Sequence, residues 1–515
     1  MTLTSSVPAA AHLAAADRRW LAACLAVGGG GSLVLVPQPW ALAFPLVAAA
    51  ALAVGVAAAR AARLAREEFV TSLALAGLAM ALAVVPAISR SPGPVALAVL
   101  ASVGLAAAAV VPPRTWTAAV LLPAVLAVRA LQAAPWVAAG VRRLRRPPAG
   151  AAAGDGAGAG DGAGAGDGAG VARASRRPAP GGVLLTVALV LVVGGLLVSA
   201  DHTLTWLMGR VSGAVADLLP AWTPADVIGR GMLALLIGGA LLAAVHARLA
   251  GQPEPPALPI RRRGAGTWGL PLVALAVMLA AFLAAQALTA SGFDVAARAE
   301  GTEYKQRIHE GFAQLVVVGV IVVAVLAWAA RLCDPQDARG RRLLAATGGP
   351  VVALMLGVVG VALSRIYGYA VDDGFTRLRL LVGAFEWWLA GVLVLVAAAW
   401  NAAVARRLPV LVIAWAGLAV LGVGLACGDA AVARYNLDRH AATGRLDVAY
   451  LTGLSADAVP VIARLPEPLR ACALARWEAR QEPDWTDAAE PGVGWNAAVA
   501  HARQVLPVSP PQRDC

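Results

Sequence analysis

The chain has 515 residues, of which 59% are hydrophobic and only 14% are charged, with a net charge of +12. Apolar runs of roughly 18 to 23 residues separate clusters of arginine, and such a run crosses a ~30 Å hydrocarbon core as a helix. This composition excludes an ordinary soluble globular protein. The arginines lie mainly in short loops, without a basic stripe of interleaved aromatic residues, so no nucleic-acid partner is predicted.

Four predicted spans occupy the N-terminal part of the chain. They cover about residues 20–36, 41–59, 69–88 and 95–111. The next segment, 115–139, differs because its apolar core is short, contains Pro123 and is followed by Arg129. We expect this segment to lie at the membrane interface and not to cross. The arginine cluster from Arg142 to Arg146 then indicates a cytoplasmic position.

A low-complexity segment follows, with a Gly-Asp-Gly-Ala-Gly-Ala repeat that places Asp155, Asp161 and Asp167 six residues apart. A tract of glycine and alanine buries too little surface to order itself, which predicts a disordered tether. The predicted organisation therefore has four parts. They are an N-terminal region (1–147), a linker (148–181), a seven-span core (182–427) and a helical tail (428–515).

The seven later spans alternate with arginine-rich loops. They cover about residues 183–198, 227–245, 268–288, 312–330, 343–363, 380–400 and 409–426. Placing the arginine-rich loops in the cytoplasm gives a cytoplasmic N-terminus and an extracytoplasmic C-terminus. The Ala-, Gly-, Val- and Arg-rich composition suggests a bacterium. We thus predict an all-α, polytopic transmembrane helix bundle of about eleven spans, multi-pass in the bacterial cell (inner) membrane.

The tail is much less hydrophobic than the spans and should form short helices outside the cytoplasm. These are expected at about 429–442, 446–454, 458–465, 469–480 and 494–506, with Asp457 as the N-cap of the third. Disulfides persist in an oxidising compartment, and a terminal residue such as Cys515 is ordered only where a contact or bond holds it. We therefore predict a disulfide between Cys472 and Cys515.

Four segments carry a resemblance. They are Ser199-Ala200-Asp201, Tyr304 with Glu310–Leu315, Arg365-Ile366-Tyr367 with Gly374–Arg379, and Tyr435-Asn436 with Leu446–Leu451 and Leu454–Pro460. Together they resemble a family of bacterial integral membrane proteins known only as a domain of unknown function, over about residues 183–506. The string Leu-Ser-x-Asp-Ala-Val-Pro is the most specific signal. The resemblance implies a shared fold and location and carries no activity.

Glu386 is the one carboxylate well inside a predicted span, about 10 Å deeper than Arg379 along the helix. Ionisable groups at this depth are costly, and they often serve as proton relays or cation sites. The structural alternative is that Glu386 pairs with Arg379 two turns back, or that it forms a hydrogen bond with a neighbouring helix.

The predicted outer loops carry a second polar set. Its members are Asp201, His202, His309, Glu310, Asp372, Asp373 and Arg377. Adjacent carboxylates at Asp372 and Asp373 suit a divalent ion, but the histidines lack ligand spacing, so we predict neither a metal nor a cofactor. Arg377 and Arg379 either bind an anionic substrate or lipid headgroup, or pair with the neighbouring aspartates.

No phosphate-binding G-x-x-x-x-G-K-[ST], G-x-S-x-G or H-E-x-x-H sequence occurs, so enzymatic activity is not favoured. A membrane-embedded enzyme would have only Asp372 and Asp373 to use. The first predicted function is transport of a small or lipid-like solute, carried by Glu386 and the outer arginines. The alternative is a signalling or envelope-assembly scaffold whose external tail binds a protein partner, with Asp457 in that tail. The lipid bilayer is a partner in either case.

Overall fold

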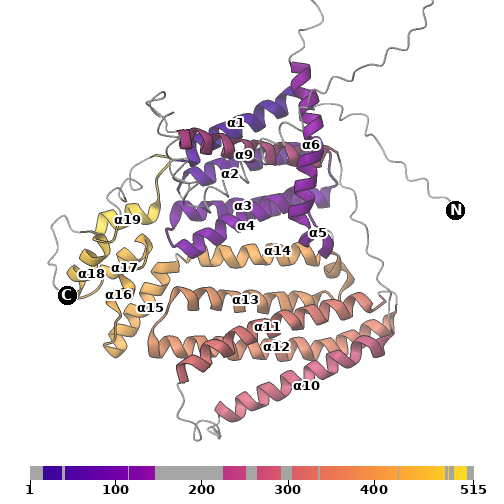
Figure 1. Ribbon diagram of the computed structural model, residues 1–515. Helices are drawn as coiled ribbons and strands as arrows, with labels where there is room; N and C mark the ends of the chain where they lie inside the picture. The colour runs from indigo at the N-terminus through magenta and orange to yellow at the C-terminus, as the bar shows by residue number, and fades with distance from the viewer. Residues whose placement is uncertain are drawn as a thin grey trace, which may run out of the picture. The chain divides into compact units, whose positions relative to one another are not determined.

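The structure is a computed structural model that describes residues 16–36, 41–113, 115–144, 224–250, 264–290, 304–334, 337–426, 428–481, 485 and 492–506. Every regular element in these ranges is a helix, as predicted (Figure 1). The chain divides into two compact units. Unit one combines residues 1–36, 53–63 and 124–252, and unit two combines residues 37–52, 64–123 and 253–515.

Each of the long helices except α6, which lies in the segment predicted at the interface, coincides with a predicted span, and α12 extends well beyond its span at both ends. They are α1 (Arg18–Leu35), α2 (Ala43–Ala61), α3 (Arg66–Ile88), α4 (Pro92–Val110), α6 (Leu122–Leu144), α9 (Pro224–Leu249), α10 (Ala265–Ala290), α11 (Tyr304–Leu332), α12 (Ala338–Asp373), α13 (Arg377–Ala398) and α14 (Ala402–Leu425). Within the described residues, eight of them are long and apolar enough to cross a membrane: α2, α3, α4, α9, α10, α12, α13 and α14. The protein is thus a polytopic membrane protein.

Five predicted segments need comment. Helix α1 is not among the eight, since its 18 residues include two arginines and four consecutive glycines, and α11 has only a shorter apolar stretch, Val317–Leu332. The segment predicted at the interface forms a short helix, α5 (Trp116–Val120), and then α6, which is not among the eight either. The linker and the span predicted at 183–198 lie outside the described residues.

Unit one is held together by a close approach of two helices, α1 and α9. Gly28 of α1 lies against the α9 backbone, because a Cβ atom at this position would be 2.6 Å from the Ala234 carbonyl oxygen and 2.9 Å from the Gly238 nitrogen. Membrane helices gain little from the hydrophobic effect and associate through such small residues, which let backbones pack. The Ala16 N–H donates to the Trp136 carbonyl (3.0 Å) and ties the start of α1 to α6.

The membrane part of unit two is a row of adjacent helices. Helices α3 and α4 form a hairpin that α14 covers, and α13 and α12 follow on from α14. Two hydrogen bonds join neighbours: Ser102 Oγ donates to the Ala79 carbonyl (2.8 Å), and Trp415 Nε1 donates to the Trp388 carbonyl (2.9 Å). An interior cluster that includes Trp268, Met355 and Leu393 packs α10, α12 and α13 together.

The C-terminal domain, residues 428–506, has its own core of the soluble type. Its helices are α15 (Gly428–Thr443), α16 (Val448–Leu451), the 3₁₀ turn η2 (Ala456–Ala458), α17 (Val459–Ile462), α18 (Leu469–Glu478) and α19 (Ala497–Val505), close to the predicted ranges. Val432, Ile462 and Trp477 are fully buried in this core. Trp477 Nε1 donates to the Leu454 carbonyl (2.8 Å), so its polar atom has a partner inside the core.

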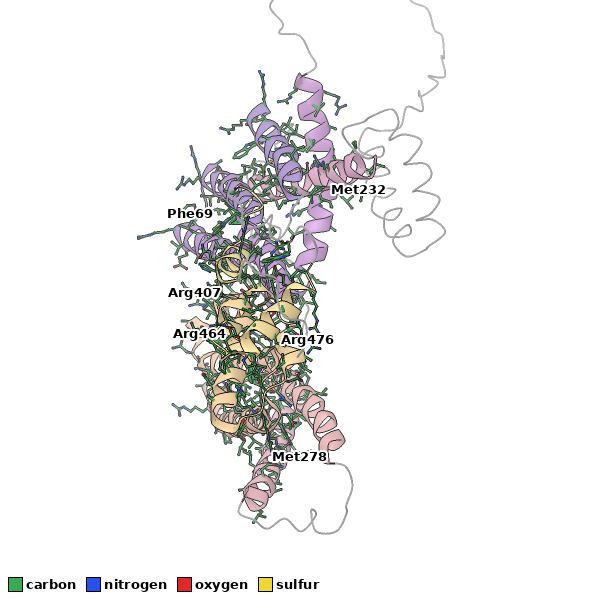
Figure 2. All side chains as sticks on the ribbon, turned by 90° about the vertical axis from the view of Figure 1, so that its left-hand side faces the viewer. Phe69, Met232, Met278, Arg407, Arg464 and Arg476 are labelled. Atoms are coloured by element: carbon green, nitrogen blue, oxygen red, sulfur yellow. The ribbon has the colours of Figure 1, made fainter. Side chains whose placement is uncertain are left out.

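Among the described residues, the hydrogen bonds and main packing contacts of this domain with the membrane helices fall at one end of unit two. That end holds the start of α2, the loop between α3 and α4, the loop between α12 and α13, and the end of α14. Figure 2 is turned so that the side on which the domain lies faces the viewer. The loops that were predicted to share one face of the membrane therefore share one end of the structure.

The α1–α9 contact leads to a prediction. Replacing Gly28 by leucine forces the side chain into the α9 backbone, and overpacking of this kind costs about 1–3 kcal/mol. We expect the thermal denaturation midpoint of the detergent-solubilised protein to fall by several degrees. Gly30→Leu is the matched control, because a Cβ atom at Gly30 meets nothing within 4 Å. Equal midpoints for the two variants would contradict the proposed packing.

Candidate functional site

A buried polar network lies at the junction between the C-terminal domain and the ends of the membrane helices. Its centre is an ion pair between Arg377, the first residue of α13, and Asp429, in the first turn of α15. Nε donates to Oδ1 at 2.7 Å and Nη2 donates to Oδ2 at 2.5 Å, a bidentate geometry. The Asp429 side chain is 1% exposed and that of Arg377 is 36% exposed. Arg377 also donates to the Gly453 carbonyl (3.1 Å).

A second buried carboxylate, Asp457, continues the network. Its Oδ2 atom accepts hydrogen bonds from the Arg90 N–H (2.7 Å), from Ser455 Oγ (2.8 Å) and from Ser91 Oγ (3.3 Å). The Ser91 hydroxyl in turn accepts from the Asp429 N–H (2.9 Å). One serine in the α3–α4 loop therefore joins the two buried aspartates of the C-terminal domain.

The prediction that Asp457 caps a helix was wrong. Neither η2 nor α17 has a side-chain cap, and Asp457 lies inside η2. The carboxylate turns to the α3–α4 loop, where backbone and hydroxyl donors are available. Burial lowers the pKa of the Arg90 guanidinium, and the Asp457 carboxylate partly offsets this shift.

The junction also satisfies backbone groups that helix ends leave without partners. At the end of α3, the Pro86 and Ser89 carbonyls accept from Asn496 Nδ2 (2.8 and 3.3 Å). At the start of α2, the N–H groups of Leu42 and Ala43 donate to the carbonyls of Trp495 and Val493, at 3.1 and 2.8 Å.

The start of α13 is completed in the same way, because the Arg377 N–H donates to the Tyr450 hydroxyl (2.8 Å). Three predicted spans thus depend on the C-terminal domain for their ends.

The loop between α12 and α13 is held by Asn436 of α15. The Asn436 side chain accepts from the Phe375 N–H (2.9 Å) and donates to the Phe375 carbonyl (2.8 Å). Its amide thus pairs with both backbone groups of one residue, as the backbone of an adjacent β-strand would. Gly374 has φ of 86°, and a Cβ atom there would lie 2.6 Å from Asn436 Oδ1. Both the backbone conformation and the close approach require glycine at this position.

Glu386 is placed as the sequence indicated, in the buried part of α13 and 2% exposed. It has no hydrogen bond or ion pair with any residue that the structure describes. Arg379 turns back to its own loop, where it donates to the Gly374 carbonyl and lies 3.8 Å from the Asp373 carboxylate. The alternative in which Arg379 pairs with an aspartate of its loop is therefore the one observed, and its pairing with Glu386 is not.

The structure does not show the remaining candidates together, because most of them lie outside the residues that it describes. Asp201, together with the side chains of His309, Glu310 and Asp372, lies outside them, as does His202. Within the described part of the chain, no group of three or more His, Cys, Asp or Glu side chains is placed to hold a metal ion. Cys472 is disulfide-bonded, whereas Cys24 is a free thiol. The pairing of Cys472 with Cys515 stays a prediction, since Cys515 lies outside the described residues.

Sequence reasoning missed four junction residues: Ser91, Asp429, Asn496 and, as a backbone donor, Arg90. Asp429 and Asn496 had a weak signal, because each stands where a helix begins and Asn496 caps α19 through the Val499 N–H (3.2 Å). Nothing in the local sequence indicates their partners, which lie more than 300 positions away for Asn496 and Ser91.

A comparison with known protein families finds a match over most of the chain. The model of the family described as Domain of unknown function (DUF4153) matches residues 75–465. The chain belongs to this family. The match corrects the extent expected from the motifs, because it begins inside α3 and includes the α3–α4 loop with Ser91 as well as Arg377, Asp429 and Asp457. No curated protein and no solved structure matches the chain.

The Arg377–Asp429 pair predicts a strong effect of mutation. Arg377→Gln leaves a buried carboxylate without its counter-ion, and because the arginine is partly exposed we expect a loss of about 2–3 kcal/mol, below that of a fully buried pair. Limited proteolysis of the native protein should cut the C-terminal domain roughly 30-fold faster or more, since cleavage follows the open population.

Two further variants test this interpretation. The exposed pair Arg470–Glu467 has the same 2.5 Å separation, so Glu467→Gln should change the cleavage rate little. The double change of Arg377→Gln with Asp429→Asn should cost less than the sum of the single changes. Additive effects would show that the two side chains do not interact.

Proposed function

We propose that the protein is an envelope scaffold in which the membrane helices hold the C-terminal domain in a fixed position for a protein partner. The observation that carries this proposal is the buried junction. Two buried carboxylates, Asp429 and Asp457, and the amide Asn496 fix the domain to the start of α13 and the end of α3, and backbone carbonyls of the domain hold the start of α2. A domain that only anchored a chain end would not need such a network.

The proposed location is the bacterial cell (inner) membrane, with the N-terminus cytoplasmic and the C-terminal domain on the extracytoplasmic face. Arginines support this orientation. At the end of unit two away from the domain, the end of α11 and the first two turns of α3, α12 and α14 carry arginines: Arg66, Arg331, Arg339, Arg341, Arg342, Arg406 and Arg407. Loops rich in arginine stay in the cytoplasm. The disulfide at Cys472 supports the same orientation, because disulfides persist in oxidising compartments.

The orientation leads to a test of the cysteines. In protein purified under non-reducing conditions and alkylated, mass spectrometry should find Cys472 linked to Cys515, and the link should be lost in a host that lacks its envelope thiol oxidase. A link to Cys427 would contradict the pairing but keep the orientation. Cys472 recovered as an alkylated free thiol would contradict the extracytoplasmic position.

Transport of a small or lipid-like solute is the second candidate function, and Glu386 is the observation that favours it. The carboxylate is buried in α13 and has no ion pair or hydrogen bond with any residue that the structure describes. A carboxylate in such a setting exchanges protons or binds a cation in many transport proteins.

Complementation of a deletion strain separates the two functions. A scaffold requires the junction, so Arg377→Gln should fail to restore envelope integrity, measured as resistance to detergent, while Glu386→Gln restores it. A transporter gives the reverse result at equal protein abundance. Glu467→Gln serves as the control that leaves both features intact. Restoration by both Arg377→Gln and Glu386→Gln would exclude both functions in this assay.

A further inference from the structure

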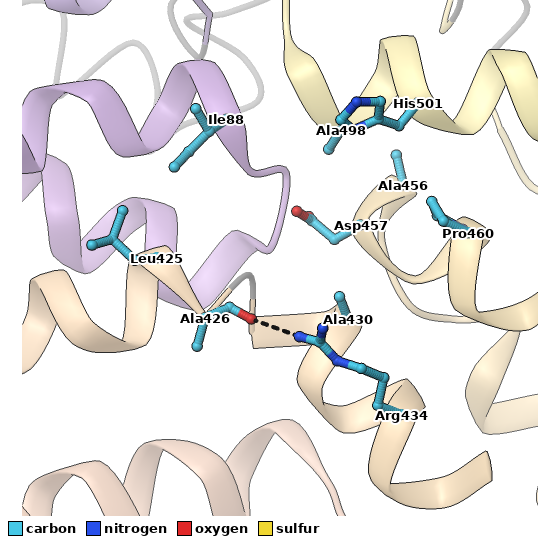
Figure 3. Close-up of a pocket in the computed structure, with 10 residues that line it drawn as sticks. All are labelled: Ile88, Leu425, Ala426, Ala430, Arg434, Ala456, Asp457, Pro460, Ala498 and His501. Atoms are coloured by element: carbon cyan, nitrogen blue, oxygen red, sulfur yellow. Dashed lines mark hydrogen bonds between the residues drawn. The ribbon is translucent and has the colours of Figure 1, made fainter. Parts of the chain in front are cut away.

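A cavity of about 230 Å³ lies beside the junction, where the C-terminal domain meets the last residues of two spans (Figure 3). Ile88 ends α3 and Leu425 ends α14, and both line the cavity. Leu425 is 57% exposed, so this wall is open to the surroundings of the bundle at the depth where a span ends. Lipid headgroups occupy this depth.

The lining divides into an apolar part and a charged part. Ile88, Leu425, four alanines and Pro460 form the apolar part. The charged or titratable part consists of Asp457 from η2, Arg434 from α15 and His501 from α19, which Figure 3 shows on three sides of the space. An apolar ligand alone would not need these three side chains.

One carboxylate oxygen of Asp457 is available to accept a hydrogen bond from a ligand. Its three hydrogen bonds within the described structure all go to Oδ2, and Oδ1 receives none from these residues. The residue is 7% exposed and lines the cavity. A buried carboxylate oxygen in this position favours a donor that carries positive charge.

Arg434 supplies the opposite charge. Its Nη2 donates to the Ala426 carbonyl at 3.4 Å, which is a long hydrogen bond and leaves most of the guanidinium donors for a ligand. Arg434 and His501 are both exposed at the cavity. Guanidinium groups bind phosphate oxygens well because their planar donors match the phosphate geometry.

We propose that this cavity binds the headgroup of a phospholipid with a primary ammonium, a phosphoethanolamine group. Its ammonium donates to Asp457 Oδ1, its phosphate accepts from Arg434 and His501, and its acyl chains pass Ile88 and Leu425 into the bilayer. The cavity volume equals roughly eight times the ~30 Å³ that a water molecule occupies in the liquid, enough for a headgroup of this size. The inference does not depend on which face of the membrane the domain occupies.

The test uses the full-length protein, purified in detergent and freed of lipid. Native mass spectrometry measures the dissociation constants of three soluble six-carbon-chain lipids with ethanolamine, choline or glycerol headgroups. We expect the ethanolamine lipid to bind most tightly, because choline cannot donate a hydrogen bond and glycerol has no positive charge. Equal binding of all three would contradict the proposal and indicate lipid held only by its acyl chains.

Variants locate the binding. Arg434→Gln should raise the dissociation constant of the ethanolamine lipid by about tenfold, because one charge-assisted hydrogen bond is lost. Arg476→Gln is the matched control, since Arg476 is an exposed arginine of the same domain that does not line the cavity. His501→Gln is a second exposed variant that leaves the junction intact. Equal effects of Arg434→Gln and Arg476→Gln, or no effect of either cavity variant, would overturn the proposal.

Discussion

A helix that ends at a membrane surface leaves backbone N–H and C=O groups without partners inside the helix, and the arrangement of unit two depends on how these groups are satisfied. Leu42, Ala43 and Arg377 offer N–H groups, and Pro86 and Ser89 offer carbonyls. The C-terminal domain supplies a partner for each. The domain therefore forms part of the hydrogen bonding of these helix ends and is not an independent unit attached to them.

The ion pair at the centre of this junction contributes more to specificity than to net stability. Taking Arg377 and Asp429 out of water costs free energy that their attraction roughly repays. Misplacing the domain would, however, leave Asp429 buried without a counter-ion and Asp457 without its donors, which is far more costly. Alternative docking positions are thus penalised, and one orientation of the domain remains.

The sequence predicted those features that depend on local pattern. The spans followed from apolar length, and the short helices of the C-terminal domain lay within a few residues of their observed ends because their periodicity and capping signals are local. The depth of Glu386 in α13 followed from helix geometry alone.

The junction could not be predicted in the same way. Ser91 and Asn496 contact partners more than 300 positions away, and neither lies in a recognisable motif. Asp457 followed by Pro460 has the pattern of a helix start, yet the α3–α4 loop offers the carboxylate two donors, Arg90 N–H and Ser91 Oγ, besides the local donor Ser455 Oγ. This tertiary contact prevails over the local preference. The alanine-rich α3 and α4 carry few distinctive side chains, so the motifs placed the family boundary too late.

The two candidate functions meet on one helix. Arg377 begins α13 and is held by Asp429, and Glu386 lies nine residues further along the same helix, a rise of about 13 Å. Both residues belong to one continuous helix, whose backbone hydrogen bonds join the two positions. A displacement of the C-terminal domain would act on α13 through the Arg377–Asp429 contact, nine residues before Glu386. Under the proposed scaffold function, a partner of the C-terminal domain would therefore act on the same helix that would serve transport through Glu386.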